Sequence, residues 1–118
     1  MSARSVKATF VNTTNQFLTL QSTQLVHGEW GTQPPATIQP NGQGEWEAHS
    51  HGFATGVEGT VAYHIGQGQS QSVSAYFDDP YIGSDEFTCT VTPPTAFTCA
   101  VTSSGGDDAE VTYTLSAA

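Results

Sequence analysis

Positive charge is the scarcest feature of this sequence. Its 118 residues include only two basic side chains, Arg4 and Lys7, against eleven of Asp and Glu, which gives a formal net charge of −9. Proteins that bind nucleic acid or anionic lipid do so through clustered Lys and Arg side chains. Nothing beyond Lys7 could supply such a cluster, so the sequence predicts no nucleic-acid binding. An acidic chain is instead expected to attract cationic partners.

Long apolar runs are also missing. No segment approaches the roughly 20 consecutive apolar residues of a membrane helix. The opening MSARSVKATF lacks the apolar stretch of a signal peptide. The sequence therefore predicts a soluble protein without a signal peptide.

Signatures of catalytic and metal sites do not occur either. The chain contains no G-x-S-x-G, H-E-x-x-H or Walker motif. His49 and His51 would lie on the same side of a strand, but zinc needs a third ligand and none is spaced nearby. We therefore expect no metal and no cofactor, and interpret the two histidines as solvated residues at the end of a strand.

What the sequence does contain is alternation with a period of two. Apolar and polar residues alternate in SVKATF, TVAYHI, SVSAYF and VTYTLS, which is typical of strands with one buried face. No window has the spacing of an amphipathic helix, and Gly and Pro turn signals recur between these segments. The sequence predicts one all-β domain over 1–118, an antiparallel β-sandwich of two sheets with little or no helix.

A local repeat contains both cysteines. FTCTVTP at 87–93 is echoed by FTCAVTS at 97–103, and a hairpin folded at Pro94 would point the alternating apolar residues of both copies to one face. The predicted pairs are Phe87 with Val101, Cys89 with Cys99, and Val91 with Phe97. Directly opposed cysteines can form a disulfide, and two reduced cysteines packed in a core fit the sequence equally well.

The segment YFDDPYIGSDEF, residues 76–87, concentrates four carboxylates and four aromatic rings. Its acidic spacing does not fit an EF-hand loop, and it does not by itself indicate a pair of glycosidase acids. The pattern indicates a strand that ends at the Asp79-Pro80 dipeptide, because the residue before a proline is held extended. Alternation would place Phe77 in the core and Tyr76 and Asp78 on the opposite face.

Landmarks along nearly the whole chain occur in a distinctive order: MSAR, LVHGEWGTQPP (25–35), SHGFATGVEGTVAY (50–63), SAYFDDPYIGS (74–84) and VTYTL (111–115). Together they resemble the aegerolysin family, and most closely the small component of the binary insecticidal crystal toxins of Bacillus. The segment FTCTVTPPTAFTC (87–99) departs from that component.

This resemblance implies a β-sandwich without enzymatic activity that binds a lipid or receptor of a target-cell membrane. It also implies a larger aerolysin-like toxin subunit that forms the pore, and action on insect midgut cells. The protein would be stored in inclusions or released before it reaches its target.

The resemblance also marks VEGT and YFDDP as positions of interest. Aromatic faces attract the ammonium groups of choline and ethanolamine, and carboxylates add to that attraction. We expect Glu58, Asp78 and Tyr81, with Trp30, to form a pocket that faces a headgroup or receptor. The full membrane- or partner-binding surface is expected to comprise Trp30, Glu58, Tyr76, Asp78, Asp79 and Tyr81.

Other interpretations remain open. Trp30 and Trp46 could be core residues, and Glu58 could be a loop carboxylate that accepts backbone N–H bonds. The domain could bind a basic protein partner or a carbohydrate instead of a lipid, and it could form homo-oligomers.

Overall fold

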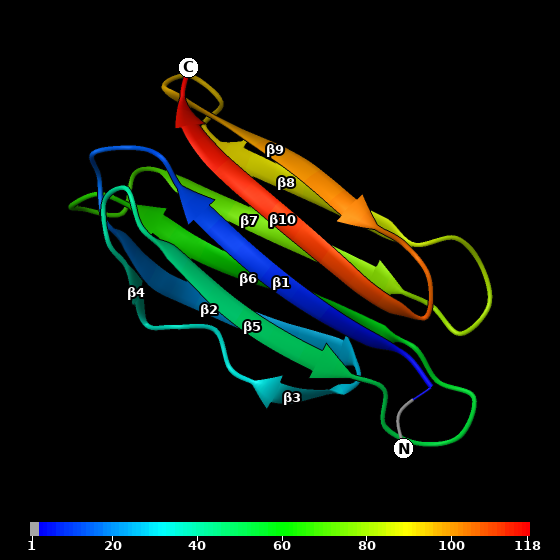
Figure 1. Ribbon diagram of the computed structural model, residues 1–118. Coiled ribbons are helices and arrows are strands. Elements are labelled where there is room, and N and C mark those ends of the chain that lie inside the picture. Colours follow the sequence, from blue (N-terminus) through cyan, green and yellow to red (C-terminus); the bar gives the residue numbers. More distant parts are fainter. Residues whose placement is uncertain (1–2) are drawn as a thin grey trace.

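The structure is a computed structural model that describes residues 3–118, and it confirms the all-β sandwich (Figure 1). One sheet has the strand order β3-β5-β1-β10-β9, and the other has the order β4-β2-β6-β7-β8. The strands of the first sheet are β1 (Ser5–Asn12), β3 (Glu29–Thr32), β5 (Gln43–His49), β9 (Phe97–Ser104) and β10 (Asp108–Ala117). Those of the second are β2 (Leu18–His27), β4 (Thr37–Ile38), β6 (Val57–Ile65), β7 (Ser72–Asp79) and β8 (Glu86–Thr92). Among the described residues, no helix is long and apolar enough to cross a membrane.

One strand pair departs from the expected antiparallel arrangement. Strands β1 and β10 run parallel in the middle of the first sheet, with Ser5 opposite Asp108 and Asn12 opposite Leu115. The pairs of β1 with β5 and of β10 with β9 are antiparallel. Alternation along a strand does not specify the direction of its neighbour, so the sequence pattern could not show this parallel pair.

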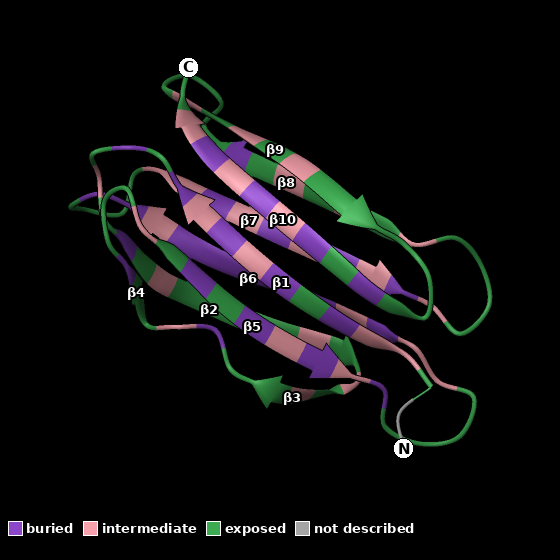
Figure 2. Ribbon diagram, in the orientation of Figure 1, coloured by how far each residue is buried: buried purple, intermediate pink, exposed green. Residues whose placement is uncertain are grey.

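The core lies between the two sheets and is built around stacked aromatic rings. Along most strands, buried positions alternate with exposed or half-buried ones (Figure 2). Trp46 is 1 % exposed and stacks on Tyr113 with ring centroids 5.9 Å apart, so it is a core residue. The Tyr113 hydroxyl donates a hydrogen bond to the Tyr76 carbonyl oxygen at 2.6 Å, which satisfies its polar end inside the sandwich. Full burial of each large apolar side chain contributes about 1.5–3 kcal/mol.

The cysteine repeat does not form the predicted hairpin. Strand β8 pairs with β7 in one sheet, and β9 pairs with β10 in the other. The six alternating residues do not share one face of a hairpin as predicted; they pack against the core from two facing edge strands. A disulfide joins Cys89 and Cys99 with their Cα atoms 5.6 Å apart. It therefore links the edges of two different sheets rather than two strands of one ladder.

Candidate functional site

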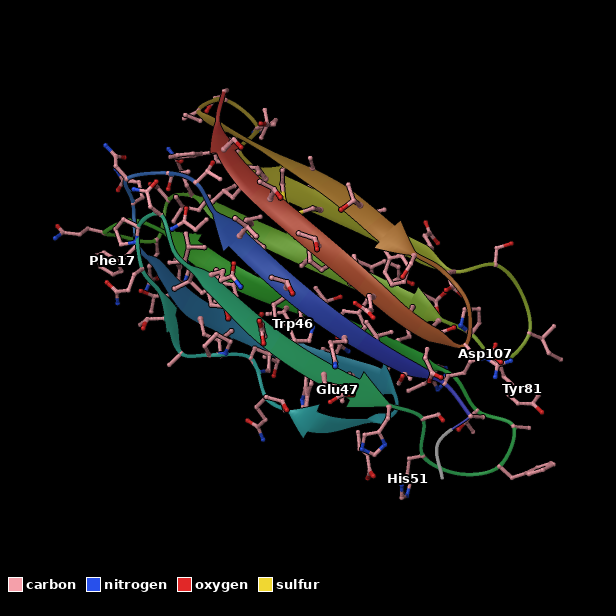
Figure 3. All side chains as sticks on the ribbon, in the orientation of Figure 1. Phe17, Trp46, Glu47, His51, Tyr81 and Asp107 are labelled. Atoms are coloured by element: carbon pink, nitrogen blue, oxygen red, sulfur yellow. A yellow bond between two sulfur atoms is a disulfide. The ribbon has the colours of Figure 1, made fainter. Side chains whose placement is uncertain are left out.

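A cleft opens at the end of the sandwich where the loop at 50–56, between β5 and β6, meets the loop at 80–85, between β7 and β8. His51 and Tyr81, labelled in Figure 3, mark the two loops. A Cβ atom at Gly56 would lie 2.8 Å from the Asp79 carbonyl oxygen and from the Pro80 Cα atom, so glycine permits this close approach. The cleft has a volume of about 320 Å³ and is lined by His27, Ala54, Thr55, Gly56, Val57, Glu58, Asp78, Pro80 and Tyr81.

Two carboxylates lie side by side in the lining of this cleft. Glu58 on β6 is directly opposite Asp78 on β7 in the antiparallel ladder. The same transverse row continues to His27 on β2 and to Glu86 on β8. Opposed side chains in such a ladder have Cβ atoms only about 4.5–5.5 Å apart, and like charges there are destabilising. Burial, followed by the charges of Glu58 and Glu86, raises the pKa of Asp78 above its ordinary value.

Tyr76 holds one of these carboxylates in place. Its hydroxyl donates a hydrogen bond of 2.7 Å to Oε2 of Glu58 from the neighbouring strand. That bond, with a smaller contribution from burial, raises the pKa of the Tyr76 hydroxyl. Glu58 itself lies on strand β6 and is half-buried, so the interpretation as a loop carboxylate bound to backbone N–H groups is wrong. Tyr76 supports the cleft from beside it.

Arg4 fixes the loop that carries Tyr81. Its guanidinium lies 4.8 Å from the centroid of the Tyr81 ring and donates from Nη2 to the Tyr81 carbonyl oxygen at 2.8 Å. It also donates from Nε to the Pro80 carbonyl oxygen at 3.2 Å, and pairs with Asp107 at 3.4 Å. Asp107 lies near Tyr81 at the same end of the molecule (Figure 3). One face of the Tyr81 ring is thus already occupied by a cation.

Three of the six predicted surface residues, Trp30, Tyr76 and Asp79, are not among the residues that line the cleft. Trp30 is half-buried on the edge strand β3, where its ring packs against Phe77 at a centroid distance of 6.2 Å. Asp79 is 1 % exposed, because alternation along β7 turns it to the same side as the core residue Phe77. The structure therefore brings Glu58, Asp78 and Tyr81 together as predicted, and places Trp30, Tyr76 and Asp79 outside the lining of the cleft.

Asp79 instead lies beneath the loop at 80–85. Burial, together with the neighbouring Asp85 carboxyl, raises the pKa of Asp79 to about 7, and the Arg4 charge opposes that rise. Its Oδ2 atom is buried and has no hydrogen-bond partner among the described residues. The carboxyl group therefore retains its proton at a higher pH in the folded protein than in the unfolded chain.

Glu29 lies between the two histidines that the sequence singled out. Its carboxylate oxygens are 3.6 Å from Nε2 of His49 and 3.2 Å from Nδ1 of His51. Across residues 3–118, no group of three His, Cys, Asp or Glu side chains is arranged to hold a metal ion. We interpret the cluster as a link between edge strand β3 and the start of the loop at 50–56.

Two exposed apolar residues at the rim were missed by the sequence reasoning. Phe53 is 95 % exposed and Ile82 is 86 % exposed, and each belongs to one of the two loops that form the cleft. A usable signal was present, since each is a large apolar residue next to glycine in a turn-like segment, HGFATG and YIGS.

Comparison with known proteins places the fold more securely than the function. No protein-family model matches the chain. An uncharacterized protein of Dictyostelium discoideum is 31 % identical over 104 residues, which cover 88 % of this chain. The chain spans only 9 % of the length of that relative.

Solved structures match the sandwich at low sequence identity. The lipid binding protein Nakanori superimposes with a TM-score of 0.86 at 13 % identity, covering 98 % of this chain and 72 % of that chain. The RahU protein, solved in complex with a TRIS molecule, has a TM-score of 0.79 at 14 % identity and covers 100 % and 98 %. The lectin XCL of Xerocomus chrysenteron has a TM-score of 0.65 at 12 % identity and covers 98 % and 100 %. These likenesses show an aegerolysin-like fold.

Proposed function

We propose that the protein binds lipid membranes by taking a cationic headgroup, such as choline or ethanolamine, into the cleft. The observation that carries this proposal is the side-by-side placement of Glu58 and Asp78 on neighbouring strands in the cleft lining. An ammonium group between the two carboxylates would relieve their mutual repulsion, so binding is favoured by both attractions at once.

The chemistry around the carboxylates fits the same ligand. Tyr81 borders the cleft, and an aromatic ring near an ammonium adds roughly 0.5–2 kcal/mol. With a net charge of −9, the protein would be repelled by anionic lipid, which favours zwitterionic membranes.

Two of the structural neighbours support this choice through what their names state. Nakanori is described as a lipid binding protein, and RahU was solved with TRIS, a small amine that is protonated near neutral pH. The proposal for this chain rests on its own cleft residues, with these neighbours as support.

The more specific part of the proposal concerns toxicity. The motif resemblance supports a role as the membrane-binding component of an insecticidal pair, acting with a larger aerolysin-like pore-forming subunit on insect midgut cells. Binding of the isolated protein to midgut vesicles, with and without such a subunit, separates direct membrane binding from docking on the subunit. Binding only in the presence of the subunit would favour the protein-docking alternative.

Vesicle co-sedimentation tests the headgroup proposal directly. Glu58→Gln and Asp78→Asn each remove one negative charge from the cleft, and each should weaken binding to phosphatidylcholine–phosphatidylethanolamine vesicles by roughly tenfold. Glu110→Gln is the matched control, because Glu110 is exposed on the opposite sheet. Unchanged binding by both cleft variants would overturn the proposal.

A carbohydrate ligand is the second candidate, favoured by the structural match to the lectin XCL. Glycan-array binding that is lost in Asp78→Asn, combined with no sedimentation on vesicles, would replace the lipid proposal with this one.

A further inference from the structure

The two most exposed large apolar side chains of the described residues lie at the same end of the sandwich. Phe53 and Ile82 are 95 % and 86 % exposed, and their loops touch where Gly56 approaches Asp79 and Pro80. The fold gains nothing from these side chains, since neither packs against the core. Their exposure at one end of the molecule makes them candidates for contact with a partner.

The loop at 50–56, and the part of the loop at 80–85 that precedes Asp85, carry no acidic side chain, in a chain that has eleven. A carboxylate carried into the apolar part of a membrane is strongly unfavourable. Residues 50–56 and 80–84 therefore bring no acidic side chain of their own to a membrane interface, although the exposed Asp107, paired with Arg4, lies at the same end of the molecule.

We propose that Phe53 and Ile82 form a two-loop apolar tip that enters the interfacial layer of a lipid bilayer and stands the sandwich end-on to the membrane. This inference rests on the proposed membrane binding, and it adds the part of the protein that penetrates. Tyr81, next to Ile82 and held by Arg4, supplies an amphipathic ring of the kind that is enriched at membrane interfaces.

A bilayer fits this tip better than a protein partner does. A stable protein interface buries about 800 Å² on each side and requires complementary shape. Phe53 and Ile82 stand on two separate loops, each beside a glycine, and present two projecting side chains instead of a continuous face. Insertion into the interfacial layer requires apolar area but no complementary shape.

The position of the carboxylates agrees with this orientation. Asp78 precedes Ile82 at the end of β7, and Glu58 follows Phe53 at the start of β6, so both carboxylates lie behind the apolar tip. A tip that enters the interface would leave Glu58 and Asp78 at the level of the ammonium groups, which lie outermost in zwitterionic headgroups. A single orientation of the protein on the membrane thus places the apolar tip in the interface and the two carboxylates near the ammonium groups.

Site-specific fluorescence tests the tip. Cys89 and Cys99 are joined in a disulfide, so a single cysteine introduced by Phe53→Cys or Ile82→Cys can be labelled with an environment-sensitive nitrobenzoxadiazole dye. Phe17→Cys is the matched control, because Phe17 is 39 % exposed and lies at the opposite end of the molecule from Tyr81 (Figure 3). The probe membrane is an equimolar mixture of phosphatidylcholine and phosphatidylethanolamine.

We expect the dyes at positions 53 and 82 to shift to shorter wavelength on vesicle addition and to be quenched by spin-labelled acyl chains, while the dye at position 17 is unchanged. In unlabelled protein, Phe53→Ser and Ile82→Ser should each lower the vesicle partition coefficient by roughly tenfold, and Phe17→Ser should not. Thermal unfolding should be unchanged in Phe53→Ser and Ile82→Ser, because both side chains are almost fully exposed.

The outcomes separate this inference from the proposed function. If the wild-type protein sediments with the vesicles while the dyes at 53 and 82 stay unchanged, the tip is wrong and membrane binding stands. If the tip dyes respond but Glu58→Gln and Asp78→Asn bind normally, the headgroup cleft is wrong and the tip stands. If the wild-type protein does not sediment with any zwitterionic vesicle, both are wrong.

Discussion

Glu58 and Asp78 lie directly opposite each other on adjacent antiparallel strands, and the Tyr76 hydroxyl is hydrogen-bonded to the first of them. A like-charge pair in this position lowers the stability of the sheet. Local rules of protein stability are most often violated at functional sites. This pair is therefore the strongest single indication of where the protein binds its ligand.

Tyr76→Phe should weaken lipid binding without removing a charge. The variant lacks the hydroxyl that fixes the Glu58 carboxylate, so Glu58 becomes free to turn toward solvent. We expect a few-fold loss of vesicle affinity and a drop of about 1 kcal/mol in the free energy of unfolding. Urea denaturation and vesicle co-sedimentation measure the two effects. Wild-type affinity in Tyr76→Phe would show that the hydrogen bond has no role in binding.

Asp79 should make the protein less stable as the pH rises. Its pKa is raised from the ordinary 3.8 to about 7 on folding, so the folded state binds more protons than the unfolded state between those values. The free energy of unfolding should therefore fall across that window and level off above it.

Thermal melts at about pH 5 and about pH 8 check the direction of this change. The wild type should have the lower melting temperature at about pH 8. In Asp79→Asn the difference should shrink, whereas in Glu110→Gln, which removes an exposed charge, it should persist. If Asp79→Asn showed the same difference in melting temperature between the two pH values as the wild type, Asp79 would not be the cause of that difference.

Reduction of the disulfide should loosen one edge of the sandwich. Cys89 and Cys99 are ten residues apart in sequence, and they tie β8 of one sheet to β9 of the other. Loss of a cross-link with this spacing should lower the free energy of unfolding by about 2–3 kcal/mol. Urea denaturation with and without dithiothreitol measures the effect. The double variant Cys89→Ser with Cys99→Ser should not respond to dithiothreitol, and a response there would mean that the reductant acts elsewhere.

Arg4→Ala should destabilise the cleft end of the molecule more than Lys7→Ala. Arg4 donates to two carbonyl oxygens of the loop at 80–85 and lies over the Tyr81 ring, whereas Lys7 is exposed on the outer face of β1. Each change removes one positive charge, so the overall charge effect is matched. We expect a loss of about 1–2 kcal/mol for Arg4→Ala. Faster amide hydrogen exchange in residues 80–85 should accompany it, and equal exchange in both variants would contradict this role.

The sequence predicted local features well, because side-chain alternation directly reports which face of a strand is buried. It placed Phe77 in the core, Tyr76 and Asp78 on the other face, and Glu58, Asp78 and Tyr81 in one cleft. The placement of Phe77, Tyr76 and Asp78 follows from a period of two. The grouping of Glu58, Asp78 and Tyr81 was implied by the family resemblance of the segments that contain them.

One error concerns the relationship between distant segments, and the others concern single residues. The cysteine repeat resembles a hairpin, but its halves pair with β7 and β10 in different sheets, because each sheet already had an open edge for one of them. Asp79 was expected at a surface corner, although the same alternation that placed Phe77 inside also turns Asp79 inward. Phe53 and Ile82 were missed because exposure of an apolar loop residue is not encoded in periodicity.

The parallel pair of β1 and β10 also affects how the chain reaches this fold. The middle of the first sheet is completed only when β10 is inserted between β1 and β9, after the rest of the sandwich has been synthesised. Until β10 has been made, β1 therefore has one unpaired ladder edge and an apolar face that is only partly covered. This condition promotes aggregation. Folding of the domain therefore requires the strand at 108–117 to reach the one at 5–12, and contacts this far apart in sequence make that step slow.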